Sequence, residues 1–354
     1  MGKIDVAKLA AAEEDERYRY LLKHGIVKRV EDEDKIIFAE LQQIRGVLVV
    51  YRKPSEREQN PDRLNLDRRE LDHLPLLEGE EKLRLLNLQH NNIQKIENLV
   101  SLPNLIFLDL YSNKIREIIH LHTVPTLRVL MLGKNQIERI RNLQSLSKLD
   151  VLDLHSNKIT KIENINHLSE LRVLNLANNM ITSVENLNGL VSLTELNLRR
   201  NQIDSVSGLH CCPKLQRIYL AHNKLEKLDR IAALKDAPSL TEVCLDGNPI
   251  YAHSLSALTR FLAENCASLT TLDDLKLTPE LRDQIAKTSD AEAPFAFLPE
   301  NENKENKSSN FAQPPQPTAV DTNALLSLSD ATIEHEAPPP GRPGMLSSVA
   351  AMQA

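Results

Sequence analysis

The chain has 354 residues, of which 43 are basic and 49 acidic, and the stretch from Asp290 to Ala354 holds three of the former and nine of the latter. The rest is formally neutral, which gives no reason to expect nucleic acid or an anionic membrane as a partner. No run of eighteen apolar residues occurs, and charged residues interrupt the amino terminus. We therefore expect no membrane span and no secretory signal, and a cytoplasmic location.

Residues 1–55 are predicted to be a helical segment. Asp5 suits the cap of a first helix that stops at His24–Gly25. A second helix is indicated by apolar residues with the spacing of one helix face, Ile37, Leu41 and Ile44. The short run 47–51 is β-prone.

Residues 83–250 repeat one phrase, Leu-x-x-Leu-x-Leu-x-x-Asn-x-Ile. The eight copies begin at Leu83, Leu105, Leu127, Leu149, Leu171, Leu193, Leu215 and Leu240. Spacing of 22 residues, lengthened once by three, is typical of an α/β leucine-rich repeat solenoid with one strand per unit and a parallel, concave sheet. We expect the repeated asparagine to be structural, because its side chain can bond loop backbone on both sides.

The segments that flank the repeats are predicted to close the solenoid. Residues 56–82 keep the apolar register but carry Arg69 in place of asparagine, as a degenerate capping repeat would. Residues 251–289 contain an amphipathic pattern and are assigned to a carboxy-terminal cap. Residues 290–354 hold nine of the eighteen prolines and too few apolar residues for a core, so we expect a disordered tail.

No motif indicates an enzyme. Phosphate loops, dinucleotide fingerprints, zinc-protease motifs and nucleophile elbows are all missing from the sequence. The four cysteines lack the paired spacing of a zinc site. We therefore expect no cofactor, no metal, no catalytic residue and no small-molecule substrate.

The repeat does predict a binding surface. In each strand the third, fifth and seventh positions of the phrase point away from the core, because side chains alternate across a strand. An apolar stripe in the third-position column, with aromatic residues nearby, is the anatomy of a protein-binding site. The candidate residues on this concave face are Leu85, Phe107, Asp109, Tyr111, Val129, Met131, Val151, Asp153, His155, Val173, Arg199, Arg217 and Tyr219. Two alternatives stay open: valine also suits strands without a ligand, and acidic neighbours can pair with Arg199 and Arg217 internally.

Several phrases use surface positions that the repeat leaves free, among them 60–69 (Asn-Pro-Asp-Arg-Leu-Asn-Leu-Asp-Arg-Arg), 149–155 (Leu-Asp-Val-Leu-Asp-Leu-His) and 193–199 (Leu-Thr-Glu-Leu-Asn-Leu-Arg). These phrases resemble the leucine-rich repeat-containing protein 49 family, non-catalytic subunits of the tubulin polyglutamylase complex. The resemblance implies a scaffold whose partners are a tubulin-tyrosine-ligase-like glutamylase and other complex subunits, with tubulin reached indirectly. It also implies a location on microtubules, cilium or basal body. Longer family members continue beyond the repeats, where this chain has a short tail.

A competing hypothesis comes from another class. The 22-residue unit also resembles the leucine-rich regulatory subunit of protein phosphatase 1 and its cytoskeletal relatives. In addition, Lys35–Phe38 fits the loose basic-hydrophobic-x-aromatic pattern by which partners dock to that phosphatase as a strand. A regulatory subunit of that phosphatase, or another ciliary or cytoskeletal adaptor, is therefore the alternative function.

Overall fold

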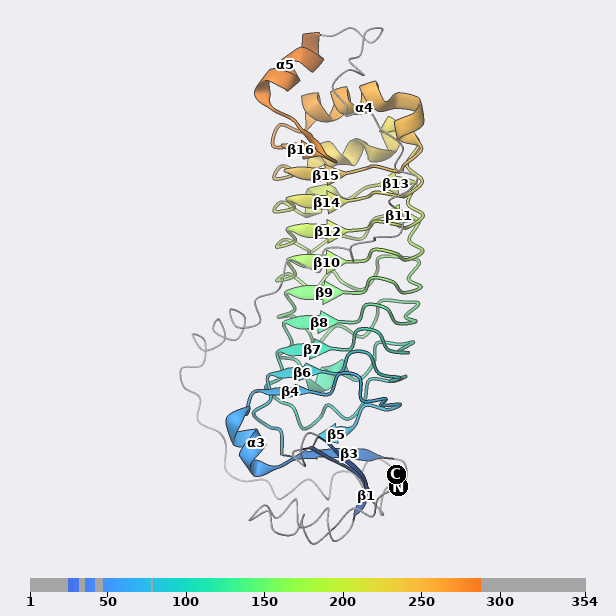
Figure 1. Ribbon diagram of the computed structural model, residues 1–354. Coiled ribbons are helices and arrows are strands. Elements are labelled where there is room, and N and C mark those ends of the chain that lie inside the picture. Colours follow the sequence, from blue (N-terminus) through green and yellow to red (C-terminus); the bar gives the residue numbers. More distant parts are fainter. Residues whose placement is uncertain (1–24, 32–35, 42–46, 78, 288–354) are drawn as a thin grey trace, which may run out of the picture. The chain divides into compact units, whose positions relative to one another are not determined.

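The computed structural model describes residues 25–31, 36–41, 47–77 and 79–287. All of them belong to one compact unit of the chain. Figure 1 shows the repeats as stacked turns, each contributing a short strand to one side. The predicted tail and the first predicted helix lie outside the described residues.

Within the described residues, eleven strands form the main sheet, in the order β17-β16-β15-β14-β12-β10-β9-β8-β7-β6-β4. The strands are β4 (Arg63–Asn65), β6 (Leu85–Asn87), β7 (Phe107–Asp109), β8 (Val129–Met131), β9 (Val151–Asp153), β10 (Val173–Asn175), β12 (Glu195–Asn197), β14 (Arg217–Tyr219), β15 (Glu242–Cys244), β16 (Thr271–Leu272) and β17 (Leu275–Lys276). Neighbouring strands from β4 to β16 are parallel and in register, so Leu86, Leu108 and Leu130 lie side by side on successive strands. The predicted solenoid is confirmed.

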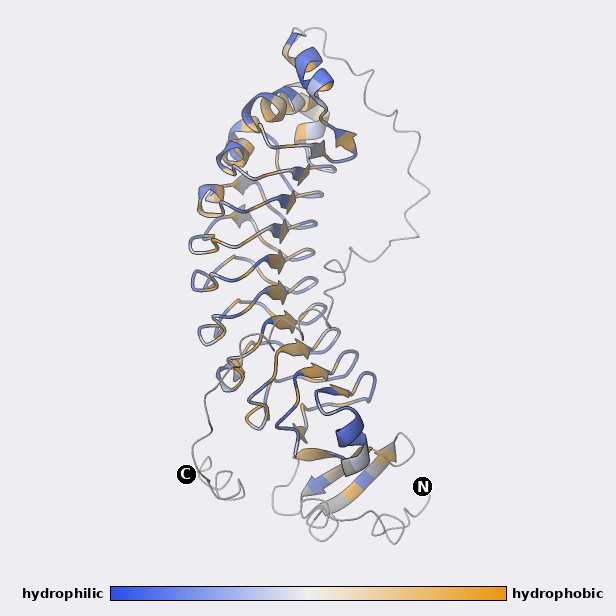
Figure 2. Ribbon diagram, turned by 90° about the vertical axis from the view of Figure 1, so that its left-hand side faces the viewer, coloured by the Kyte–Doolittle hydropathy of each residue, from blue (hydrophilic) through white to orange (hydrophobic). Residues whose placement is uncertain are grey.

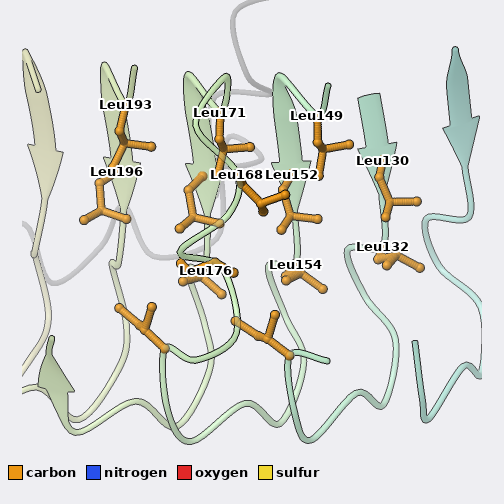
Figure 3. Packing of buried hydrophobic residues seen from close by; sticks show 14 of the residues in the cluster. Leu130, Leu132, Leu149, Leu152, Leu154, Leu168, Leu171, Leu176, Leu193 and Leu196 are labelled. Carbon is orange, nitrogen blue, oxygen red and sulfur yellow. The ribbon is translucent and has the colours of Figure 1, made fainter. Parts of the chain in front are cut away.

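One continuous core lies behind this sheet. The apolar residues at the fourth and sixth positions of each repeat, mostly leucines, and the apolar residues of each return segment are fully or almost fully buried. Figure 3 shows how leucines from neighbouring turns line up in rows, such as Leu132, Leu154 and Leu176. Figure 2 shows the apolar colour along the stacked turns, alternating with hydrophilic positions in the loops. The 22-residue period therefore explains the core directly.

The repeated asparagines bond adjacent turns together, as predicted. Asn157, for example, donates from Nδ2 to the carbonyl oxygens of Leu132 (3.0 Å) and Leu154 (2.9 Å), and its Oδ1 accepts from the N–H of Ile137 (2.9 Å). The same kind of bonding is made by Asn91, Asn113, Asn135, Asn179, Asn201, Asn223 and Asn248. All eight are buried.

A second column of asparagines, which was not predicted from the sequence, also bonds adjacent turns together, on the return side. The Nδ2 groups of Asn98, Asn142, Asn164 and Asn186 each donate to a carbonyl oxygen of the preceding turn, over 2.7–2.9 Å. Their φ angles lie between 58° and 60°, a left-handed conformation that asparagine tolerates better than most residues. This explains why asparagine recurs there.

The return side also carries short elements. They are the 3-10 helices η1 (Leu121–Thr123), η2 (Leu209–Cys211) and η3 (Leu228–Asp236) and the paired strands β11 (Ser183–Val184) and β13 (Ser205–Val206). The lengthened repeat contains η3, which packs against η2, β13 and the following helix. The three additional residues are thus accommodated away from the main sheet.

The amino-terminal segment differs from its prediction. Residues 36–41, expected as a helix, form strand β2 (Ile36–Leu41) between β1 (Gly25–Glu31) and β3 (Leu48–Arg52) in an antiparallel arrangement, with β5 (Leu76–Leu77) parallel to β3. Ile36 and Phe38 pack into the main core, whereas Ile37 and Ala39 pack with residues of β3 on the opposite side. Both faces of β2 are therefore buried. The apolar run 36–39 gives no alternation, and the spacing of Ile37 and Leu41 matches one face of a helix equally well.

A buried ion pair joins this small sheet to the repeats. Arg52, at the end of β3, donates from Nε to Glu80 Oε1 over 2.9 Å, and its Nη2 also contacts Glu80 Oε2. The guanidinium further donates to the carbonyl oxygens of Asn60 (2.6 Å) and Arg63 (2.9 Å). Helix α3 (Pro54–Gln59) lies between β3 and β4. Arg52 and Glu80 are only 2 % and 1 % exposed. Arg57 Nε also lies 3.7 Å from Glu80 Oε1, but Glu80 is the carboxylate that pairs with the buried Arg52.

The carboxyl-terminal end is covered by α4 (Ile250–Asn265) and α5 (Pro279–Lys287), with β16 and β17 between them. Leu258 and Leu262 of α4 are buried against the last repeat. The guanidinium of Arg282 in α5 donates to the carbonyl oxygens of Ala263, Cys266 and Leu269. Arginine thus satisfies groups that the end of α4 leaves unpaired.

Candidate protein-binding face

The third, fifth and seventh positions of the repeat lie together on one side of the main sheet, which we call the sheet face. In-register pairing places equivalent residues of neighbouring strands side by side, for example Leu85, Phe107 and Val129. All thirteen candidate residues occupy this face, but they differ in how accessible they are.

The predicted apolar stripe is interrupted. Leu85, Phe107 and Val173 are half-buried, but Val129 is 0 % and Val151 2 % exposed. Val129 lies in register between Phe107 and Val151, and its short side chain is covered by its larger surroundings. The expectation that both valines are available to a partner is therefore wrong. Two of the three partly accessible apolar residues of the stripe, Leu85 and Phe107, are adjacent in the amino-terminal strands, and Val173 is separated from them by the covered valines.

The two arginines of the carboxyl-terminal part of the face, Arg199 and Arg217, contact neighbouring residues of the same face. Arg217 forms an ion pair with Glu195, with Nη2 and Oε2 2.8 Å apart. The guanidinium of Arg199 lies 4.3 Å from the centre of the Tyr219 ring and donates to Cys244 Sγ over 3.3 Å. Burial raises the pKa of Tyr219 to about 12. Pairing with an acidic neighbour, the alternative considered for these arginines, is therefore found for Arg217, whereas Arg199 contacts Tyr219 and Cys244.

The middle of the face holds a packed group of rings. His155 Nδ1 and Asp153 Oδ1 are 2.7 Å apart, and both residues are buried. The Tyr111 ring packs 5.6 Å from the His155 ring and 5.4 Å from the ring of His90, centre to centre. Gly133 makes this packing possible, because a Cβ there would lie 2.5 Å from the His155 ring. The sequence signal was a glycine in the seventh-position column.

The fifth-position column contains a repeated local bond. A side-chain Oδ1 accepts from the N–H two residues further on in Asn65 (3.0 Å), Asn87 (3.0 Å), Asp109 (2.9 Å), Asp153 (3.0 Å), Asn175 (3.2 Å) and Asn197 (3.2 Å). Asparagine and aspartate favour this turn because their short side chains reach that amide. The bond requires an oxygen acceptor, not a charge.

Asp109 differs from the rest of this column. Burial raises its pKa from 3.8 to about 6; the hydrogen bond from the Tyr111 N–H opposes the shift, and the charges of Asp153 and Asp67 add to it. In the described part of the chain no basic group forms an ion pair with it. Asp109 is thus a half-buried carboxylate without a countercharge, beside the accessible apolar residues.

Asp109→Asn should stabilise the protein near neutral pH. The native state holds the proton of Asp109 more tightly than the unfolded chain, so ionisation destabilises the fold above about pH 6, and this cost disappears as the pH falls towards about 4. Asparagine can still accept the hydrogen bond from the Tyr111 N–H. We therefore expect the free energy of unfolding to rise by an amount on the order of 2 kcal/mol at neutral pH. Urea denaturation at several pH values measures it. Asp72→Asn, an exposed control, should give no pH-dependent gain.

The segment that fits the phosphatase-docking pattern overlaps strand β2, and both edges of this strand are already hydrogen-bonded within the protein. Strand β2 pairs on one edge with β1 and on the other with β3. Phe38, the aromatic residue of the pattern, is 0 % exposed. Docking as an added strand requires free backbone and an accessible side chain, and the folded segment offers neither.

Comparison with known proteins places the repeats in a class. A family model described as leucine-rich repeats (2 copies) matches residues 81–121, 125–167 and 169–210. The sequence comparison with curated proteins gives no match. The matched residues are therefore similar to leucine-rich repeats, in agreement with the solenoid fold.

Solved structures support the same fold. An internalin (inlF) from Listeria monocytogenes is 23 % identical, with a TM-score of 0.50, and the match covers 61 % of each chain. The leucine-rich repeat domain of APL1B is 22 % identical, with a TM-score of 0.51, over 62 % of this chain and 65 % of that one. The chain therefore spans less than two thirds of either structure, and the likeness shows the fold alone.

Metal-binding clusters and membrane-spanning helices are both absent from the described ranges. His, Cys, Asp and Glu side chains there do not gather in threes suited to a metal ion. None of the helices in those ranges has the length and apolarity that a membrane crossing requires.

Proposed function

We propose that this chain is a non-catalytic scaffold subunit of a tubulin polyglutamylase complex that acts on microtubules in the cytoplasm. The observation that carries its scaffold role is the accessible cluster of Leu85, Phe107 and Tyr111 on the neighbouring turns of β6 and β7. The surface phrases that resemble the polyglutamylase subunit family support the choice of complex. Its partners are then a tubulin-tyrosine-ligase-like glutamylase and other subunits, with tubulin reached indirectly.

The chemistry of the reaction fits this division of labour. Adding glutamate through an isopeptide bond needs an activated carboxylate and hence a nucleotide, and the sequence holds no nucleotide-binding motif. The chain would contribute by positioning, because tethering raises the effective concentration of the enzyme near its substrate. It should be inactive alone and required in the assembly.

The double substitution Leu85→Glu and Phe107→Glu tests the proposal. Burying either side chain against a partner stabilises a complex by about 1.5–3 kcal/mol, and a glutamate would instead strand a charge in the contact. Tagged protein purified from cells should therefore lose its other subunits, and its eluate should lose glutamate incorporation on microtubules. Circular dichroism checks that the solenoid remains folded.

The matched control is Val100→Glu with Val191→Glu. These valines are 49 % and 47 % exposed and lie outside the sheet face, so the same chemical change should leave recovery and activity intact. Full recovery of subunits with the Leu85 and Phe107 variant would contradict the role of the face. Polyglutamylation by the purified recombinant chain alone would contradict the scaffold assignment.

A further inference from the structure

The charge of Asp109 is not needed by the fold. Four positions of its column carry asparagine, Asn65, Asn87, Asn175 and Asn197, and make the same bond to the amide two residues on. The other aspartate of the column, Asp153, is buried and has His155 Nδ1 2.7 Å from its Oδ1. Asp109 accepts the bond from the Tyr111 N–H and forms no ion pair with a basic group of the described residues. Its charge is therefore available to something outside the described chain.

The surroundings of Asp109 favour a cation with an apolar stem. Asp109 lies in register between Asn87 and Met131, and Phe107 and Tyr111 are on its own turn. Lysine and arginine side chains combine a charged head with methylene groups that pack on apolar and aromatic surface. Phe107, Tyr111 and Met131 are all partly accessible to such a side chain.

The other charged groups of this region add to the same field. Asp67 and Asp153 both act on Asp109 as like charges. Lys134 lies over the Tyr111 ring, with Nζ 5.2 Å from its centre, and His90 and His155 pack on that ring. Arg63, in register with Leu85 at the amino-terminal edge of the face, lies 3.3 Å (Nε to Oδ1) from the carboxylate of Asp62, and at the far end Arg217 is paired with Glu195. The amino-terminal half therefore complements a basic partner and repels an acidic one.

We propose that the half of the sheet face around Asp109 binds a protein segment that presents a lysine or arginine side chain to the Asp109 carboxylate, with Phe107, Tyr111 and Met131 packing on its stem. The inference deepens the proposed function, since it takes the sheet face as the protein-binding surface. Within that function it assigns this half of the face to a basic segment of another subunit and not to an acidic tail.

A display library of random heptapeptides, selected on the purified full-length protein at about pH 7.5, tests the inference. Selected peptides should be enriched in lysine or arginine over the unselected library. The most frequent peptide, labelled with fluorescein, should bind Asp109→Asn about 10- to 100-fold more weakly than wild type, the loss expected for a charge-assisted hydrogen bond. Asp72→Asn should bind as wild type does.

The pH dependence of peptide binding tests whether the Asp109 carboxylate is the group that the peptide contacts. Proton uptake by Asp109 between about pH 7.5 and pH 5.5 should weaken peptide binding to wild type, and Asp109→Asn should lose most of this dependence. If the variant kept it, a group other than Asp109 would cause the pH dependence and the proposal would be wrong. Enrichment of acidic peptides, no enrichment of basic residues, or equal affinity for Asp109→Asn would also overturn it.

The two tests fail independently. Loss of subunits in the Leu85 and Phe107 variant with no preference for basic peptides would keep the scaffold and remove this inference. Binding of basic peptides at Asp109, together with full recovery of the subunits by the Leu85 and Phe107 variant, would keep the Asp109 site and remove the role of Leu85 and Phe107 in assembling the complex.

Discussion

Glu80→Ala should lower the free energy of unfolding by about 3–5 kcal/mol, because it leaves the buried Arg52 cation without its charge partner. The structure gives Arg52 two backbone carbonyl oxygens besides Glu80, and neither carries a full charge. Chemical denaturation measures the loss. Hydrogen exchange should show faster opening of β2 and β3, since Arg52 closes the end of β3 against the repeats.

An exposed pair of the same geometry is the control. Arg139 donates to Glu163 from Nε (2.9 Å) and Nη2 (3.0 Å), but the arginine is on the surface. Glu163→Ala should therefore change stability far less, because water already solvates both groups. Equal losses in the two variants would show that the amino-terminal sheet does not depend on its buried pair.

Leu152→Ala should destabilise the solenoid by about 2–5 kcal/mol. Leu152 is fully buried in β9 and lies in register between Leu130 and Leu174. Adjacent turns are tied by asparagine bonds and cannot collapse into the space left by the side chain. Urea denaturation of the full chain provides the measurement.

Thr160→Ala, at an exposed position of the same repeat, should change stability by less than about 0.5 kcal/mol. A comparably small effect of Leu152→Ala would mean that the core does not follow the repeat register. Leu174→Ala, one turn further on, should behave like Leu152→Ala.

The repeats were predictable because each position of the phrase has one structural task. Leu86 must be apolar and Asn91 must bond two turns, and both requirements recur every 22 residues. A periodic sequence therefore averages out local ambiguity. The segment before the repeats has no period: Ile37 and Leu41 fit a helix face by spacing alone, and only long-range pairing with β1 and β3 decides for a strand.

The candidate site was predictable in position but not in accessibility. Alternation along the strand correctly assigned Val129 to the sheet face, yet whether a valine is covered depends on the size of its neighbours on adjacent strands. The special environment of Asp109 was likewise not predictable. Its column contains both asparagine and aspartate, and only the structure shows that Asp153 contacts His155 whereas Asp109 has no such side-chain partner in the described residues.

The lengthened repeat shows where this chain tolerates change in length. In regular turns the amide that bonds the asparagine lies 20 residues before it, as in Ile203 and Asn223, whereas Leu225 lies 23 residues before Asn248 and still forms the bond over 3.1 Å. Strand β15 also stays in register with β14. A loop, tag or small domain inserted at η3 should therefore leave the sheet face undisturbed. This position is thus suited to attaching a label to the protein inside an assembly.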